Sequence, residues 1–233
     1  MDFFNRLFGK PGKVTLATID YNKYFDNDEV DGVRLELFKI GELSVSSGKI
    51  IVCDPLVNYG ALPLTRAVNP GKYPVTVCIA HTDQAGERYA AAKLEFSKSK
   101  AKRWELAVIE GQDVSKLKEE DDYFGFPVDA GLGCFMDAET NRFYDELSDQ
   151  YRQRRPEKDI YNDLIAVEFK KNAKDQTNPN DIGDWLDFYL PNKPDLNIIM
   201  FSSGFGDGTY PSYWGVTESG EICSLVIDFI VLG

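Results

Sequence analysis

The stretch that decides the fold runs from residue 73 to residue 97 and reads YPVTVCIAHTDQAGERYAAAKLEFS. Its first part, Tyr73 to His81, is rich in β-branched and apolar residues, and its last part, Glu87 to Ser97, again carries apolar and aromatic residues. Thr82 to Gly86 separates them with polar side chains and a glycine. Two strand-forming runs joined by a short glycine-containing segment predict an antiparallel β-hairpin.

The flanking segments repeat this pattern. Glu42 to Ser46 and Lys49 to Cys53 have the composition of strands on either side of a turn at Ser47-Gly48, and Asp54-Pro55 ends the second of them. Arg103 to Glu110 adds a further strand after a basic loop. Consecutive hairpins of this kind predict an antiparallel meander in the N-terminal half.

The periodicity changes between Asp137 and Gln176. Phe143, Leu147 and Tyr151 recur every four residues, which predicts a helix with one apolar face. Pro156 is placed to open a second helix at its first turn. The apolar residues of this second helix are Ile160, Leu164 and Val167. We therefore expect a two-helix insert over residues 137–176.

Strand signals return after the insert. The expected strands are Trp185 to Leu190, Leu196 to Phe201, and Tyr213 to Thr217 paired with Ile222 to Val231. Strands on both sides of a helical insert predict a single α+β domain over residues 1–233, mainly antiparallel β-sheet. Within this domain, residues 1–12 contain a short amphipathic segment, Asp2 to Gly9, expected to be a helix that covers the protein's own core.

Composition and charge exclude several classes of protein. The chain has 233 residues, 43% of them hydrophobic, which is enough to form a sizeable core and excludes disorder. The formal net charge of -12 repels phosphate backbones and favours basic partners, so nucleic acid is not an expected ligand. No segment reaches the length of a membrane span or resembles a signal peptide, so we expect a cytoplasmic protein without stable membrane insertion.

The spacing of the four cysteines indicates that they are core residues and not metal ligands. Cys53, Cys78, Cys134 and Cys223 are widely spaced and the chain has a single histidine, which excludes a zinc site of ordinary Cys/His spacing. We expect Cys53, Cys78 and Cys223 to be reduced and buried, because each lies in an apolar strand pattern.

Two glycine-rich segments are the candidates for a functional site. The first, residues 202–210, contains Ser203, Asp207 and Tyr210 among alternating glycines and is followed by Trp214. The second, residues 128–137, contains Asp129 and ends at Asp137, a residue type that caps helix N-termini. Glycines let the backbone approach a ligand closely, and carboxylates, hydroxyls and aromatic rings supply contacts to it. Each segment is equally compatible with a tight structural corner.

A joint site is the sharper hypothesis. If the two segments meet, Asp129 and Asp207, together with Asp54, form a set of carboxylates that suits a divalent cation or acid/base chemistry. Tyr210 or Trp214 would line the shared concavity. The sequence identifies no cofactor, no metal and no reaction.

Other motifs are incomplete. The serines at 202 and 203 lack the glycine of a hydrolase elbow, and the acidic segment 26–32 lacks the spacing and the final glutamate of a calcium loop. Gly204, Gly206 and Gly208 do not match a nucleotide-binding fingerprint.

Several short motifs in combination resemble one bacterial family, domain of unknown function 4241. They are Ser47-Gly48-Lys49, Cys53-Asp54-Pro55-Leu56, Tyr73-Pro74-Val75, Arg103-Trp104-Glu105-Leu106-Ala107, Val128-Asp129-Ala130-Gly131, residues 203–210 and Asp228-Phe229. The similarity runs from about Gly41 to the C-terminus. The resemblance implies a bacterial cytosolic protein in which the Asp129 and Asp207 loops are the site common to the family. It implies no particular activity for the family.

Two classes of function follow from the sequence. In the first, the protein is an acidic binding module, such as an immunity-like partner of a basic protein, because it has no recognisable nucleophile and a strongly negative charge. In the second, it is an enzyme or a binder of a small ligand or divalent cation that uses Asp54, Asp129, Ser203, Asp207, Tyr210 and Trp214.

Overall fold

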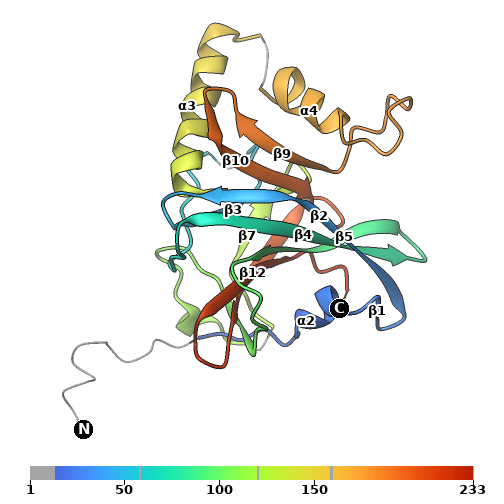
Figure 1. Ribbon diagram of the computed structural model, residues 1–233, viewed down its shortest axis with the longest axis vertical. Helices are drawn as coiled ribbons and strands as arrows, with labels where there is room; N and C mark the ends of the chain where they lie inside the picture. Colours follow the sequence, from blue (N-terminus) through green and yellow to red (C-terminus); the bar gives the residue numbers. More distant parts are fainter. Residues whose placement is uncertain (1–13, 58, 120, 158–159, 233) are drawn as a thin grey trace, which may run out of the picture.

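Two antiparallel β-sheets form the body of the fold, which we describe from a computed structural model that covers residues 14–57, 59–119, 121–157 and 160–232 (Figure 1). The larger sheet has the strand order β1-β2-β4-β5-β12-β11-β6, and β7 also pairs with β11. The smaller sheet has the order β3-β8-β10-β9.

The larger sheet contains β1 (Glu29–Val30), β2 (Val33–Val45), β4 (Gly71–Thr82), β5 (Gly86–Glu95), β6 (Arg103–Leu106), β7 (Gly125–Val128), β11 (Gly208–Val216) and β12 (Ile222–Asp228). The smaller sheet contains β3 (Ile50–Cys53), β8 (Leu132–Asp137), β9 (Trp185–Leu190) and β10 (Lys193–Ser202). The helices of the described residues are α2 (Asn22–Asp26), the 3₁₀ helix η1 (Val114–Lys116), α3 (Ala138–Arg154), the π-helix η2 (Tyr161–Ile165) and α4 (Ala166–Lys170).

Strand alternation sorts the buried side chains into layers. In β10, Ile199 and Phe201 enter the core between the two sheets, whereas Ile198 and Met200 belong to the cluster beneath the helices. Successive side chains of a strand point to opposite faces, so a strand covered on both faces is apolar throughout. The opposite face of the larger sheet packs into a further apolar cluster that includes Tyr21, the residue before α2. Helix α2 lies near the C-terminus (Figure 1).

The buried Asn197 links the two sheets. The Asn197 side chain on β10 accepts a hydrogen bond from the Ser44 backbone N–H at 2.8 Å. Its amide group donates to the Glu42 carbonyl at 2.9 Å and to the Asp187 carboxylate at 2.6 Å. The amide thereby provides hydrogen-bond partners for backbone groups of β2 on the edge that faces away from β4.

The structure confirms the α+β class with mainly antiparallel sheet and several of the expected elements. β4 and β5 form the expected hairpin, with Thr82 opposite Gly86. β11 and β12 pair as expected. Helix α3 begins after Asp137, whose carboxylate accepts the Glu139 backbone N–H at 2.9 Å, so the expected N-cap is also confirmed.

The hairpin expected around Ser47-Gly48 is wrong. β2 pairs with β4 in the larger sheet, whereas β3 pairs with β8 in the smaller one. The turn is a corner at which the chain passes between sheets: Gly48 has φ +76°, and a Cβ there would lie 2.4 Å from the Val68 carbonyl oxygen. Local turn residues predict a change of direction but not the partner of the next strand.

The meander and the second helix also differ from expectation. β12 lies next to β5, so β6 pairs instead with β11 at the edge of the sheet. The second helical stretch consists of η2 followed by α4 and ends at Lys170, and Pro156 lies before it. The two-helix insert is therefore only roughly correct.

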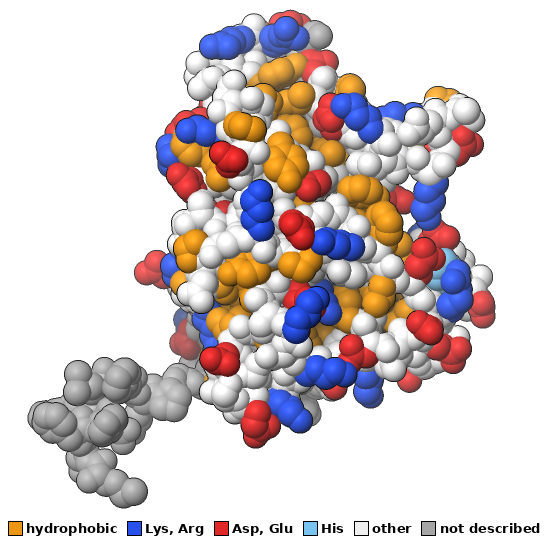
Figure 2. Space-filling model, in the orientation of Figure 1, with side chains coloured by type: hydrophobic (Ala, Val, Ile, Leu, Met, Phe, Trp, Pro, Cys, Tyr) orange, Lys and Arg blue, Asp and Glu red, His pale blue; other side chains and the backbone are white. Residues whose placement is uncertain are grey.

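Cys53, Cys78 and Cys223 are buried and free, as expected, and Cys134 is as well. The helix expected at residues 2–9 lies outside the described residues. Within the described part of the chain, no helix has the length and apolar character to cross a membrane. On the face drawn in Figure 2, exposed hydrophobic side chains lie in separate patches among charged ones.

Candidate functional site

The two glycine-rich loops meet at the end of the β7–β11 ladder. Gly208 pairs with Val128, so Asp207 and Asp129 are the next residues beyond the last pair of the antiparallel ladder. The Ser203 backbone N–H also donates to the Gly131 carbonyl at 3.1 Å, which joins the loops a second time. The expected proximity of the two loops is confirmed.

Asp54 holds the loop that contains Asp129. Its fully buried carboxylate accepts the backbone N–H groups of Asp129 at 3.1 Å and Ala130 at 2.7 Å on one oxygen. The other oxygen accepts the Leu56 N–H at 3.1 Å. A carboxylate that accepts three backbone amides is engaged in holding the chain, which leaves little of it for a ligand.

Ser203 and Tyr210 organise the other loop. The Ser203 hydroxyl donates to the Gly206 carbonyl at 3.0 Å, and the Tyr210 hydroxyl donates to the same carbonyl at 2.9 Å. Gly204 has φ +50°, and a Cβ there would lie 2.9 Å from the Phe229 Cβ, so the loop needs glycine at this position. Burial, followed by the negative charge of Asp207, raises the pKa of Tyr210.

Asp129 and Asp207 themselves are exposed. Neither carboxylate has a hydrogen-bond or ion-pair partner among the described residues. Phe205, at the tip of the second loop, is 60% exposed, with the Arg88 guanidinium carbon 5.8 Å from its ring centroid. In the part of the chain that the structure describes, no group of three or more His, Cys, Asp or Glu side chains is arranged to hold a metal ion.

Trp214 lies apart from this cluster. It is four residues beyond Tyr210 on β11, about 13 Å away at the rise of a β-strand. Its ring is buried in the core between the sheets and packs near Phe96, with ring centroids 6.1 Å apart. The structure thus brings together Asp54, Asp129, Ser203, Asp207 and Tyr210, and separates Trp214 from them.

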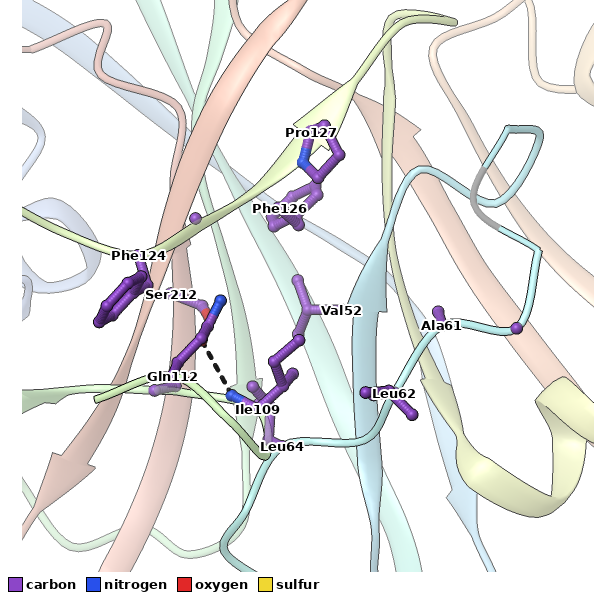
Figure 3. Close-up of a pocket in the computed structure, with 13 residues that line it drawn as sticks. Val52, Ala61, Leu62, Leu64, Ile109, Gln112, Phe124, Phe126, Pro127 and Ser212 are labelled. Atoms are coloured by element: carbon purple, nitrogen blue, oxygen red, sulfur yellow. Dashed lines mark hydrogen bonds between the residues drawn. The ribbon is translucent and has the colours of Figure 1, made fainter. Parts of the chain in front are cut away.

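A cavity of about 340 Å³ opens beside the other end of β7 (Figure 3). It forms where β11 changes partners: Pro211 pairs with Gly125 of β7, whereas Tyr213 pairs with Leu106 of β6. Ser212 lies at the change, between the two aromatic residues Tyr210 and Trp214 on the inner face of β11. A small side chain at this point leaves the space unfilled.

The wall of the cavity is mainly apolar. Its lining residues are Val52, Gly60, Ala61, Leu62, Leu64, Ala107, Ile109, Gln112, Phe124, Gly125, Phe126, Pro127 and Ser212. The Gln112 side-chain oxygen accepts the Ile109 backbone N–H at 3.0 Å, and its NH₂ group has no partner among the described residues (Figure 3). The Ser212 hydroxyl likewise has none within those residues. The lining therefore combines apolar surface with two unused polar groups.

Sequence reasoning did not identify this cavity. Its walls come from β3, the 60–64 loop, the segment after β6 and β7, which are far apart along the chain. The only local signal is Ser212, a small polar residue at an inward position of a strand that otherwise places Tyr210 and Trp214 there.

Asp228, part of one of the sequence motifs, is another buried carboxylate. It accepts the Tyr21 hydroxyl at 2.7 Å and the Ile230 backbone N–H at 2.8 Å. Burial raises the pKa of Asp228, and the two hydrogen bonds oppose that shift. Both oxygens have a donor, which indicates an architectural role.

Comparison with known proteins places the chain in a family. The sequence model described as Protein of unknown function (DUF4241) matches residues 43–227, most of the chain and both loops of the cluster. The chain belongs to this family. The matched range also includes every lining residue of the cavity, from Val52 to Ser212. Neither the curated proteins nor the solved structures compared with the chain include a match.

Proposed function

We propose that this DUF4241 protein is a binding protein and that the cavity beside β7 is its ligand site. The ligand would be a small neutral or cationic organic molecule with an apolar body and one hydrogen-bonding group. The volume of about 340 Å³ lies within the range of ordinary ligand pockets. The net charge of -12 disfavours an anionic ligand.

The observation that carries this proposal is the partner change of β11 at Ser212. It creates a hollow in an otherwise continuous sheet, with the Ser212 hydroxyl and the Gln112 amide as polar groups on an apolar wall. Neither group has a hydrogen-bond partner among the described residues, so both are available to bond to a ligand in the cavity. No lining residue is titratable, which supports binding without chemistry.

Fluorescence titration with N-phenyl-1-naphthylamine, a neutral apolar probe, tests the site. We expect saturable binding to the wild type and at least a tenfold loss in Ser212→Leu, whose larger side chain occupies the cavity. Ser99→Leu adds the same side chain at an exposed position outside the cavity wall and should bind like the wild type. Equal binding by Ser212→Leu, with its fold verified by circular dichroism, contradicts the proposal.

A second variant tests the polar group. Gln112→Glu keeps an acceptor for the Ile109 N–H but replaces the amide donor with a carboxylate. Neutral fragments with a hydrogen-bond acceptor should lose affinity in this variant, whereas purely apolar fragments should not. Equal losses for both fragment classes would mean that Gln112 has no part in recognition.

The Asp129 and Asp207 surface favours a second candidate function, an acidic module for a basic protein, as an immunity-like partner would be. The two carboxylates are exposed and have no ion-pair partner among the described residues, and the exposed Phe205, with Arg88 near its ring, precedes Asp207 by two residues. An aromatic anchor beside unpaired charge is typical of protein interfaces. The bacterial cytoplasm remains the expected compartment, supported by four free cysteines.

Affinity purification from the native cell tests this second function. A basic protein enriched by the wild type should be lost with Asp129→Asn/Asp207→Asn and retained with Asp28→Asn/Asp31→Asn, which removes the same charge elsewhere. The purified partner should then bind with a salt-dependent affinity that the first double variant weakens. Equal effects of both double variants would show that net charge alone is responsible.

A further inference from the structure

Two of the four cysteines lie directly opposite each other in the smaller sheet. Cys53 on β3 is the register partner of Cys134 on β8, although 81 positions separate them in sequence. Their Sγ atoms are 3.7 Å apart, and both residues are buried. Cys78 and Cys223 lie in a different apolar cluster, on the outer side of the larger sheet.

The backbone geometry at this pair suits a disulfide. Residues directly opposite in an antiparallel pair have Cα atoms about 4.5–5.5 Å apart, and disulfides span Cα separations of about 4.4–6.8 Å. The two sulfurs need to approach from 3.7 Å to a bond length of about 2.05 Å, which side-chain rotation can supply without a change in strand register.

We propose that Cys53 and Cys134 are a site of reversible oxidative modification, at which a hydroperoxide joins the two sulfurs in a disulfide between β3 and β8. This proposal is independent of the ligand cavity.

The reaction balances in two steps. One thiol attacks the peroxide O–O bond, and sulfenic acid and one molecule of water or alcohol are formed. The second thiol displaces hydroxide from the sulfenic sulfur, which forms the S–S bond and releases water. In total the two thiols lose two hydrogen atoms and the peroxide is reduced by two electrons.

Burial sets the rate of this chemistry. Desolvation raises the pKa of the Cys134 thiol well above its ordinary value, so little of the nucleophilic thiolate is present. The pair should therefore oxidise slowly, through local opening of β3, which lies at the edge of the smaller sheet. Once made, the link would be reduced slowly in the folded protein, because the same burial limits the access of a reductant.

The link would tie down the start of the 54–64 segment. Cys53 is followed at once by Asp54, which holds the loop at Asp129 and Ala130. β3 contributes only four residues to the sheet edge, so a covalent bond to β8 removes much of its freedom to open. Oxidation would thus stiffen the strand on which both the loop cluster and the cavity wall rest.

The test uses the full chain. The reduced protein is incubated with hydrogen peroxide, denatured, alkylated with N-ethylmaleimide and digested without reductant, and the peptides are mapped by mass spectrometry. We expect a Cys53–Cys134 peptide pair, a fall in free thiols from four to two, and full reversal by dithiothreitol. The folded protein should form this pair in preference to every other pairing.

Matched variants identify the pair. Cys78→Ser and Cys223→Ser should still form the link, whereas Cys53→Ala and Cys134→Ala should not. The thermal unfolding midpoint should rise on oxidation in the wild type and not in Cys53→Ala. If an alanine variant fails to fold, the peptide map of the wild type still decides the question.

Two results would overturn the proposal. One is the absence of the Cys53–Cys134 link in folded protein even after an incubation many times longer than the one that oxidises the cysteines of the guanidinium-unfolded chain. The other is a mixture of pairings that includes Cys78 or Cys223 at comparable yield.

Discussion

Asp54→Ala should destabilise the protein because the Asp54 carboxylate holds three backbone amides at one point of the fold. Its oxygens accept from Leu56 at 3.1 Å, Asp129 at 3.1 Å and Ala130 at 2.7 Å. Hydrogen bonds to a charged group contribute about 1.5–3 kcal/mol each, so three of them set an upper limit of about 9 kcal/mol. Asp129 and Ala130 are exposed, and water can replace part of this interaction. We therefore expect Asp54→Ala to lower the free energy of unfolding by about 3 kcal/mol.

The assay is urea denaturation followed by tryptophan fluorescence, with hydrogen exchange at Asp129 and Ala130 as a local readout. Asp54→Asn keeps one acceptor oxygen and replaces the other with an NH₂ group, a donor that faces a backbone N–H. This variant should therefore lower the free energy of unfolding by about 2 kcal/mol. Asp207→Asn is the matched control, because the same substitution at an exposed carboxylate without partners should change stability by less than about 0.5 kcal/mol.

Two outcomes would refute this reasoning. One is an Asp54→Ala protein that loses less than about 1 kcal/mol, which is below the contribution of a single charged hydrogen bond. The other is unchanged exchange at the Asp129 and Ala130 amides, since these bonds are then not the ones that hold the loop.

Three further predictions concern stability elsewhere in the fold. Burial raises the pKa of Asp228, so the contribution of this carboxyl group to stability is complete below its ordinary pKa near 4 and is lost as pH rises through the raised value. Asp228→Asn should remove this decline in the urea midpoint with pH. Parallel pH profiles for the wild type and the variant would contradict the prediction. Ile230 is β-branched with φ +54° and a side chain that is 46% exposed, so Ile230→Asn should stabilise the protein by about 0.5 kcal/mol, whereas Asp31→Asn, at φ +50°, should have little effect. Ile165 is fully buried and Leu147 only partly. By thermal denaturation, Ile165→Ala should therefore lower the free energy of unfolding by about 3 kcal/mol and Leu147→Ala by about 1 kcal/mol. A loss at Leu147 as large as that at Ile165 would contradict its partial burial.

Much of the local structure follows from the sequence. The β4–β5 hairpin, the β11–β12 pair and helix α3 with its Asp137 cap depend on periodicity, turn residues and a capping side chain, all of which act within a few residues. Burial of Cys53, Cys78 and Cys223 follows in the same way from their apolar strand patterns. The family resemblance is also a property of the sequence, and the family match over residues 43–227 confirms it.

Only the tertiary structure decided which strands pair, where a cavity forms between them and which cysteines lie opposite each other. β3 has the composition of a hairpin partner for β2, yet it pairs with β8, because its two faces are buried between the sheets and beneath the helices. The cavity at Ser212 and the Cys53–Cys134 pair result from contacts between segments distant in sequence. Such contacts are selected by the free energy of packing the whole chain, which local propensities do not contain.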